Sequence, residues 1–169
     1  PQPLAAAVTT VAAPVSPLPA GGNGFTIERK YYTLDGEEAN VTQAQQNERY
    51  VVVLHITGAN SWTSRILVTD LLPAGFEIDN PSIVNSAQLS NFDWLSEVQP
   101  AHVEFRNDRF VAAFDESWGS RDLSLAYVVR AVTPGTYDHP AASVEDMYRP
   151  QFSARTAMGR MEVQAAQQQ

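Results

Sequence analysis

The chain has 169 residues and no cysteine, and its 11 basic and 19 acidic residues give a net charge of −8. This length predicts one domain with or without a tail, and a hydrophobic share of 44% excludes a wholly disordered chain. The negative charge makes nucleic acid and anionic membranes poor partners, and the absence of cysteine excludes disulfides, thiolate metal sites and a cysteine nucleophile within this chain.

The N-terminal segment differs in composition from the rest. Residues 1–24 are rich in proline, alanine and glycine and carry no charged or aromatic side chain, which is typical of an extended linker. We expect the glycines at 21–24 to break regular structure, although residues 8–15 remain an alternative edge strand. The folded domain is predicted at 25–163 and a fraying polar tail at 164–169. The chain starts with proline rather than methionine, so we expect a piece of a longer protein.

Alternation of apolar and polar residues dominates the middle of the chain, and this period of two indicates β-strands. The two clearest core strands are predicted near 50–57 and 122–131. Branched and aromatic residues predict further strands at 25–32, 65–72 and 102–114.

Turn signals divide these strands. Asn107 and Asp108 tolerate positive φ and predict a two-residue hairpin turn. Only residues 86–97 space their apolar side chains like a helix face, which predicts one or two helical turns. Seven or eight short strands with at most a short helix predict an all-β fold, an antiparallel β-sandwich of immunoglobulin or fibronectin type.

The residues offer little chemistry. The sequence lacks a Gly-x-Ser-x-Gly motif and a phosphate-binding glycine loop. The three histidines are isolated, so we expect no shared metal ion: His55 is predicted to be partly buried or at a sheet edge, and His102 and His139 to lie at the surface. No catalytic residue, metal site or cofactor is predicted, and the chain is not expected to be an enzyme. No apolar run approaches the roughly 20 residues that span a bilayer.

Four separated strings occur in a fixed order: Thr26 to Gly36, Asp70 to Ile78, Val132 to Tyr137 and Val144 to Pro150. Together they resemble the carboxy-terminal domain of bacterial alpha-2-macroglobulins, and the resemblance covers residues 25–163. It implies a macroglobulin-like β-sandwich, which agrees with the fold that the alternation predicts.

The resemblance also implies a setting. Proteins of that family are periplasmic protease traps of bacterial defence, anchored to the inner membrane through their other end. An internal thioester between a cysteine and a glutamine captures a protease after a bait region is cut. Because this chain has no cysteine, the thioester is expected elsewhere in the full-length protein. The implied partners are the other domains of the same protein, above all the thioester domain, and through the intact protein the trapped protease.

The same resemblance implies a specific contact. This domain would pack on the thioester domain and shield the bond from water, with Met147 and Tyr148 as the candidate contact residues. A methionine supplies adaptable packing and a tyrosine a rigid ring. The alternative is that both side chains belong to the domain's own core or strand edge.

Two other functions remain open. The string Asp70 to Phe76 also resembles sandwich modules that act as spacers in cell-surface or adhesion proteins, although Val144 to Pro150 argues against this. A carbohydrate-binding sandwich is the other possibility, with Trp62, Trp94 and Trp118 as stacking platforms.

Overall fold

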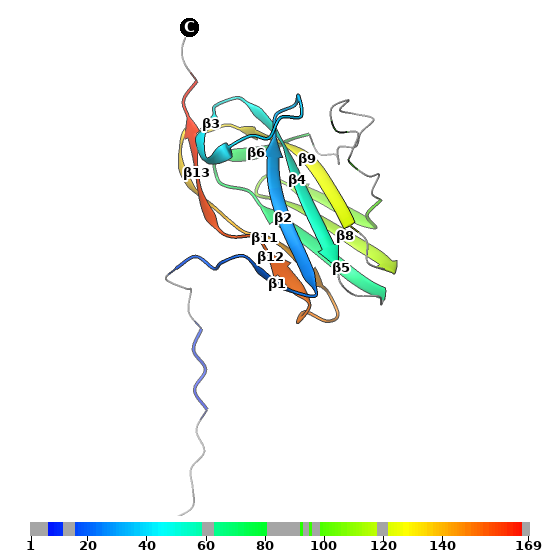
Figure 1. The fold of residues 1–169 in the computed structure, drawn as a ribbon. Coiled ribbons are helices and arrows are strands. Elements are labelled where there is room, and N and C mark those ends of the chain that lie inside the picture. Colours follow the sequence, from blue (N-terminus) through cyan, green and yellow to red (C-terminus); the bar gives the residue numbers. More distant parts are fainter. Residues whose placement is uncertain are drawn as a thin grey trace, which may run out of the picture.

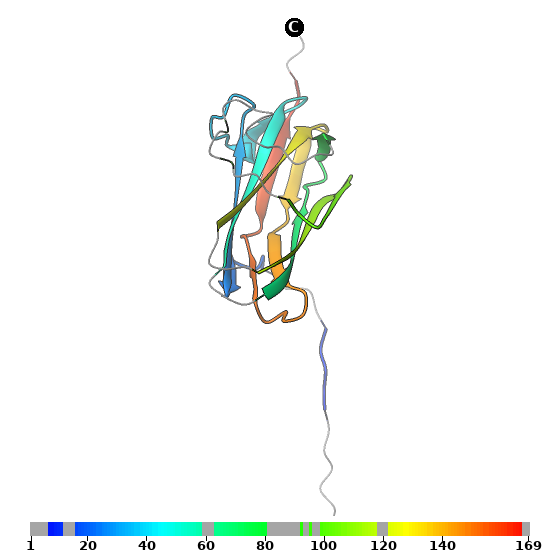
Figure 2. The same ribbon diagram turned by 90° about the vertical axis from the view of Figure 1, so that its right-hand side faces the viewer.

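The structure is a computed structural model that describes residues 7–11, 16–58, 63–80, 92, 95, 99–117 and 122–166. The described residues form mainly β-strands, and they include a short 3-10 helix, η1 (Val41–Gln43). Two large sheets form the layers of a sandwich, and a small third sheet lies along one side (Figures 1 and 2). The predicted all-β sandwich is therefore confirmed.

The first layer is a six-stranded sheet in the order β1-β12-β11-β5-β8-β7. Its strands are β1 (Gly21–Asn23), β12 (Ser153–Arg155), β11 (Ala142–Asp146), β5 (Thr63–Leu71), β8 (Arg109–Ser117) and β7 (His102–Arg106). All of its strand pairs are antiparallel. The turn between β7 and β8 consists of Asn107 and Asp108, because Arg106 pairs with Arg109. The predicted two-residue hairpin is confirmed.

The second layer is a four-stranded sheet in the order β2-β4-β9-β6. Its strands are β2 (Phe25–Tyr32), β4 (Arg49–Gly58), β9 (Asp122–Ala131) and β6 (Phe76–Asn80). The third sheet has the order β10-β13-β3, with β10 (Gly135–His139), β13 (Gly159–Gln164) and β3 (Ala44–Gln45). Its β13–β3 pair is parallel.

Strands β4 and β9 are apolar on both faces because each face packs in a different hydrophobic cluster. One face of each strand lies in the main core between the sheets, with residues Tyr50, Val52, Leu54, Ile56, Leu123, Leu125, Tyr127 and Val129. The opposite face holds a second, smaller cluster formed by Val51, Val53, Ala126 and Val128 with Phe92 and Leu95. Most of the helix predicted at 86–97 lies outside the described residues, but Phe92 and Leu95 are buried in this cluster.

Regular structure begins before the predicted boundary at residue 25. The glycine-rich segment forms β1 and pairs with β12 instead of breaking the sheet. The reason is close packing: a Cβ atom at Gly22 would lie 2.3 Å from the Phe25 carbonyl oxygen and 2.8 Å from the Ala154 Cβ atom. Only glycine permits this approach. At the other end β13 reaches Gln164, which pairs with Gln45.

The segment before β1 is exposed where the structure describes it. Val8 and Val11 have exposed fractions of 90% and 94%, and residues 7–11 belong to no strand. The rest of the alternative edge strand at 8–15 lies outside the described residues. In the described ranges, no helix has the length and apolar composition to cross a bilayer.

The C-terminal third of the chain changes sheets twice. It leaves the small sheet after β10, enters the six-stranded sheet as β11 and β12, and returns to the small sheet as β13. The two crossings lie side by side: the Ala142 amide donates to the Thr156 hydroxyl at 2.9 Å, and the Thr156 amide donates to the Ala142 carbonyl at 2.9 Å. We call residues 142–155 the β11–β12 arm. Its tip is the loop 146–152.

Candidate functional site: an exposed loop and a buried polar network

The tip of the β11–β12 arm carries the two residues that the sequence singled out. Met147 and Tyr148 have exposed fractions of 53% and 71%. Neither belongs to a core cluster of the described residues. The domain therefore presents an adjacent methionine and tyrosine on its surface.

A buried carboxylate organises this loop. Asp146 is fully buried at the end of β11. Its Oδ1 atom accepts hydrogen bonds from the backbone amides of Tyr148 at 3.0 Å and Arg149 at 3.2 Å. Its Oδ2 atom accepts one from Arg149 Nε at 2.9 Å. The backbone amide of Asp146 donates to the Phe152 carbonyl at 3.0 Å and closes the loop. The loop is therefore ordered by contacts from within the domain.

The Tyr148 ring is held from the neighbouring strand. The guanidinium carbon of Arg65, on β5, lies 5.7 Å from the ring centroid, and Arg65 Nη1 donates to the Tyr148 hydroxyl at 3.3 Å. A cation over an aromatic face at this distance is attractive. Arg65 in turn pairs with Asp115 at 3.0 Å. The ring thus has a defined orientation although most of the side chain is exposed.

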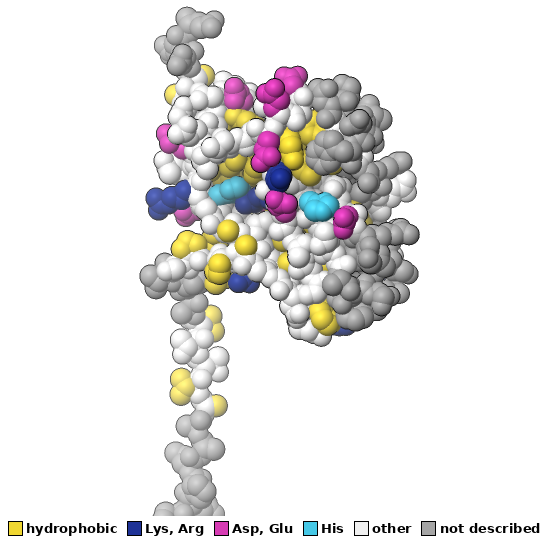
Figure 3. All heavy atoms as spheres, in the orientation of Figure 1, with side chains coloured by type: hydrophobic (Ala, Val, Ile, Leu, Met, Phe, Trp, Pro, Cys, Tyr) yellow, Lys and Arg dark blue, Asp and Glu magenta, His cyan; other side chains and the backbone are white. Residues whose placement is uncertain are grey.

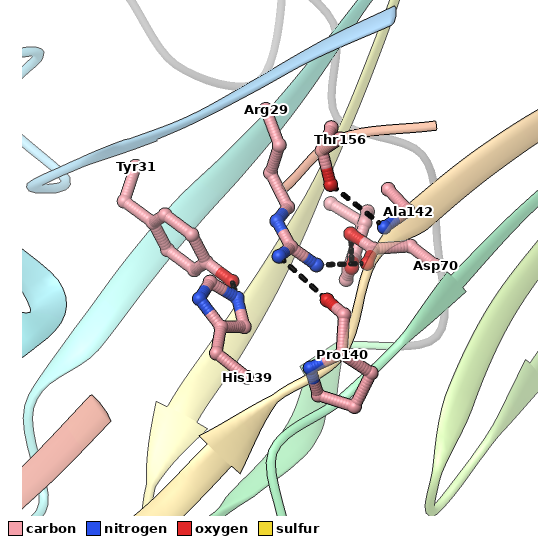
Figure 4. A network of polar contacts seen from close by, with 8 residues as sticks. Arg29, Tyr31, Asp70, His139, Pro140, Ala142 and Thr156 are labelled. Carbon is pink, nitrogen blue, oxygen red and sulfur yellow. Dashed lines mark hydrogen bonds and ion pairs between the residues drawn. The ribbon is translucent and has the colours of Figure 1, made fainter. Parts of the chain in front are cut away.

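A second polar group lies between the layers, at the base of the same arm (Figure 4). Arg29 of β2 and Asp70 of β5 form an ion pair, with 2.5 Å between Nη1 and Oδ1 and with side-chain exposed fractions of 4% and 0%. The Tyr127 hydroxyl of β9 donates to Asp70 Oδ2 at 2.7 Å. Arg29 Nη2 donates to the Pro140 carbonyl at 2.7 Å. One guanidinium therefore joins both large sheets and the crossing that leads into β11.

Burial shapes the charges of this network. It raises the pKa of the Asp70 carboxyl above its ordinary value, against the opposing effects of the Arg29 charge and the Tyr127 hydrogen bond. Burial is the largest single influence on Arg29 and lowers its pKa, but the charge and hydrogen bond of Asp70, together with Tyr31 and Tyr127, outweigh it and the net shift is upward. Burial, followed by the Asp70 charge, raises the pKa of Tyr127 well above its ordinary value. Arg29 therefore stays charged and Tyr127 stays a neutral donor.

His139 extends the network. Its Nε2 atom lies 2.8 Å from the Tyr31 hydroxyl, and the two ring centroids are 5.6 Å apart. Burial, and then the nearby Arg29 charge, lowers the pKa of His139 to about 3, so the imidazole is neutral at neutral pH. His139 is thus half-buried rather than freely exposed as expected, because its ring packs on Tyr31 of β2.

The sequence carries a signal for this network in the face pattern of β2 and β5. Arg29 shares a strand face with Phe25 and Tyr31, both buried, and Asp70 shares a face with buried Ile66 and Val68. A charged residue at an inward position of a core strand needs a partner of opposite charge. An inward arginine on one core strand and an inward aspartate on another therefore predict an ion pair between them.

The other candidates gather no comparable arrangement. His55 is half-buried, as expected, with Nδ1 3.1 Å from the Ser124 hydroxyl, and His102 is exposed. Trp62, Trp94 and Trp118 all lie outside the described residues. The outer face of the four-stranded sheet mixes acidic, basic and histidine side chains (Figure 3), and its shallow hollow is lined by Glu28, Lys30, Tyr32, Val53, His55, Asp122 and Ser124. Nowhere in the described chain do three histidine or acidic side chains meet as metal ligands would.

Comparison with known proteins gives a consistent result. Residues 24–151 match the family described as the bacterial alpha-2-macroglobulin MG10 domain. The chain is 40% identical over 153 residues to the alpha-2-macroglobulin of Escherichia coli strain K12, an alignment that covers 84% of this chain and 9% of the relative.

Solved structures agree. The native conformation of E. coli alpha-2-macroglobulin superimposes with a TM-score of 0.77 at 32% identity, covering 90% of this chain and 10% of that one. Salmonella alpha-2-macroglobulin reacted with methylamine gives a TM-score of 0.74 at 32% identity, covering 89% of this chain and 10% of that one. The chain thus spans about a tenth of the length of these relatives.

Proposed function

The chain belongs to the bacterial alpha-2-macroglobulin MG10 domain family, and we propose that it serves as the carboxy-terminal domain of a protease trap, packed against a thioester domain of the same full-length protein. In this proposal the domain catalyses nothing. Its role is to shield the thioester from water and small nucleophiles until a protease cuts the bait region.

The observation that carries the proposal is the exposure of Met147 and Tyr148 on an ordered loop. Large apolar side chains that are 53% and 71% exposed cost free energy in an isolated domain and are typical of surfaces that meet a partner. The loop is ordered before any partner arrives, because Asp146 holds its backbone and Arg65 holds the Tyr148 ring. A pre-ordered contact loses little entropy on docking.

The chemistry of the loop fits a shield. Protecting an electrophile requires apolar bulk that excludes water from a small volume. The thioether of Met147 adapts to the shape of a facing surface, and the Tyr148 ring adds a rigid plane. With no cysteine in this chain, the bond that they cover belongs to another part of the full-length protein.

The family suggests the wider setting. The proposed trap is a periplasmic protein of bacterial defence, anchored to the inner membrane through its other end, and it captures a protease covalently. Support for this comes from the relatives, which are bacterial alpha-2-macroglobulins.

The test uses the full-length protein that contains this chain. Its thioester is treated with methylamine, and the appearance of the free thiol is followed in the wild type and in the double variant Met147→Ala/Tyr148→Ala. We expect the variant to lose its thioester roughly tenfold faster, which corresponds to about 1.4 kcal/mol of barrier.

The matched control is Leu34→Ala/Leu71→Ala, which removes two other large apolar side chains of the domain surface, exposed by 38% and 37%. This variant should react at the wild-type rate. Equal rates for all three proteins, at equal melting temperatures, would contradict shielding and favour a domain that acts only as a structural spacer.

A further inference from the structure

We propose that Arg29 is a positioning residue for the Met147–Tyr148 loop: its guanidinium grips Asp70 on β5 and the Pro140 carbonyl before β11 at once, and so sets the register in which the β11–β12 arm enters the six-stranded sheet. Of the two measurements that test this inference, loop hydrogen exchange is independent of the proposed function, and the rate of thioester loss rests on it. Arg29 itself does not touch the loop.

Asp70 lies opposite the first residue of β11. Ala142, the first residue of β11, pairs with Asp70, and Asp146, its last residue, pairs with Ile66. Arg29 contacts Asp70 at 2.5 Å through Nη1 and the carbonyl two residues before Ala142 at 2.7 Å through Nη2. Figure 4 shows the guanidinium between these two groups. Because the fork of a guanidinium is rigid and planar, it fixes the crossing relative to β5.

The register of β11 also controls the loop at its end. Asp146 points into the domain and is fully buried there, where it accepts the amides of Tyr148 and Arg149. A slip of one residue along β5 turns every β11 side chain to the opposite face. The Asp146 carboxylate would then leave the interior, and the loop would lose the acceptor that shapes it. The position of Met147 and Tyr148 therefore depends on the start of β11.

The backbone ladder of β11 is short, and the buried side chains of Ala142, Val144 and Asp146 specify its register together with Arg29. β11 has five residues, and its other neighbour, β12, has three. Pro140 has no amide hydrogen to add a rung to the ladder. Two hydrogen bonds between Ala142 and Thr156 join the two crossings to each other, and the ladder with β5 begins only at Ala142. Arg29 holds the crossing itself against β5, because a slip of β11 would carry the Pro140 carbonyl away from Arg29 Nη2 and leave a buried guanidinium short of an acceptor, which is unfavourable.

A stabilising role is the weaker explanation of this ion pair. Pairs buried to this degree often add little net stability compared with apolar residues of similar size, and their best-attested role is to specify one arrangement over others. A positioning role predicts a loss of loop order that exceeds any loss of global stability.

The discriminating variant is Arg29→Lys in the full-length protein. Lysine keeps the positive charge opposite Asp70 but presents a single ammonium group, which cannot hold two partners in the fixed geometry of a guanidinium. Two measurements are made: hydrogen exchange of the peptide that contains Tyr148 and Arg149, and the rate at which methylamine consumes the thioester. We expect both to rise, the second by roughly three- to tenfold.

The matched control is Arg49→Lys, since Arg49 forms a more exposed ion pair with Asp79 at 3.0 Å. It should change neither measurement. Adding Arg29→Lys to Met147→Ala/Tyr148→Ala should give no further acceleration by methylamine, because both changes open the same path.

If Arg29→Lys does not fold, Arg29→Met/Asp70→Leu replaces the pair with apolar side chains and removes the grip on Pro140 without leaving a buried charge. It should show the same faster exchange at the loop.

The outcomes separate the two proposals. Unchanged loop exchange in a folded Arg29 variant would overturn the positioning role, whatever the thioester does. Unchanged methylamine rates for Arg29→Lys beside a fast Met147→Ala/Tyr148→Ala variant would overturn it as well and leave the shielding function intact. Faster loop exchange with no effect of Met147→Ala/Tyr148→Ala on the thioester would support positioning and overturn the shielding function.

Discussion

The carboxylate of Asp146 is fully buried, and it accepts a hydrogen bond at 3.0 Å from the backbone amide of Tyr148, a residue that is 71% exposed. A buried side chain is thus hydrogen-bonded to the backbone of an exposed residue only two positions later in the chain. The conformation of the exposed loop is set by a group inside the domain, so the loop is ready for a partner before it meets one.

Removing this carboxylate should loosen the loop and destabilise the domain. In Asp146→Ala the Tyr148 amide loses its acceptor, and the Arg149 amide is left with the Asp146 backbone carbonyl at 3.1 Å. We expect a loss of about 2 kcal/mol in the free energy of unfolding. Asp146→Asn keeps an oxygen acceptor and should lose about half as much. Urea unfolding of the chain measures both. An alanine variant as stable as the asparagine variant would contradict the capping role.

The Tyr127 hydroxyl should matter more than an exposed one. Tyr127→Phe keeps the stack on Phe110, whose ring centroid is 4.5 Å away, but removes the hydrogen bond to buried Asp70. The loss should be about 1–3 kcal/mol, because the carboxylate is left short of a donor. The control is Tyr137→Phe, whose hydroxyl donates to the Thr133 carbonyl at an exposed site and should cost less than about 1 kcal/mol. Equal losses in thermal unfolding would argue against the buried network.

His139 should make the domain sensitive to acid. Its folded-state pKa of about 3 lies below the ordinary value of 6.5, so the unfolded chain binds the proton first as the pH falls. Stability is therefore unaffected by this group above about pH 7 and declines below 6.5, with a limiting slope of about 1.4 kcal/mol per pH unit. The decline continues until the folded-state pKa is reached.

The measurement is the free energy of unfolding between pH 7.5 and 5. His139→Gln should flatten the curve in this window, whereas His102→Gln, at an exposed position, should leave its slope unchanged. A slope that is the same in all three proteins would contradict the burial of a neutral imidazole.

The glycine pair in β1 offers a test of where the domain begins. Gly22→Ala places a Cβ atom 2.3 Å from the Phe25 carbonyl oxygen, whereas a Cβ atom at Gly21 meets nothing within 4 Å. Gly22→Ala should therefore detach β1 from β12 and speed proteolytic cleavage near residues 20–24, and Gly21→Ala should not. Equal cleavage of the two variants would show that β1 contributes little to the fold.

The sequence alone determined those features that depend on neighbours along the chain. The alternation at 50–57 and 122–131 predicted two core strands, and the structure has β4 and β9 there. The turn at Asn107 and Asp108 is likewise local. Both signals persist because strand faces and tight turns are set by a few consecutive residues. The family strings singled out Met147 and Tyr148 without indicating whether they face inward or outward.

Tertiary structure decided the rest. Arg29 contacts Asp70, 41 positions away in the sequence, and Pro140, 111 positions away. Strand β1, near the start of the chain, pairs with β12, near its end. His139 is half-buried because its ring packs on Tyr31 of β2, and Met147 and Tyr148 are exposed because they lie in the loop that follows β11. The partner of a charge and the burial of a side chain depend on which strands become neighbours, and that choice minimises the free energy of the whole sandwich rather than of any single segment.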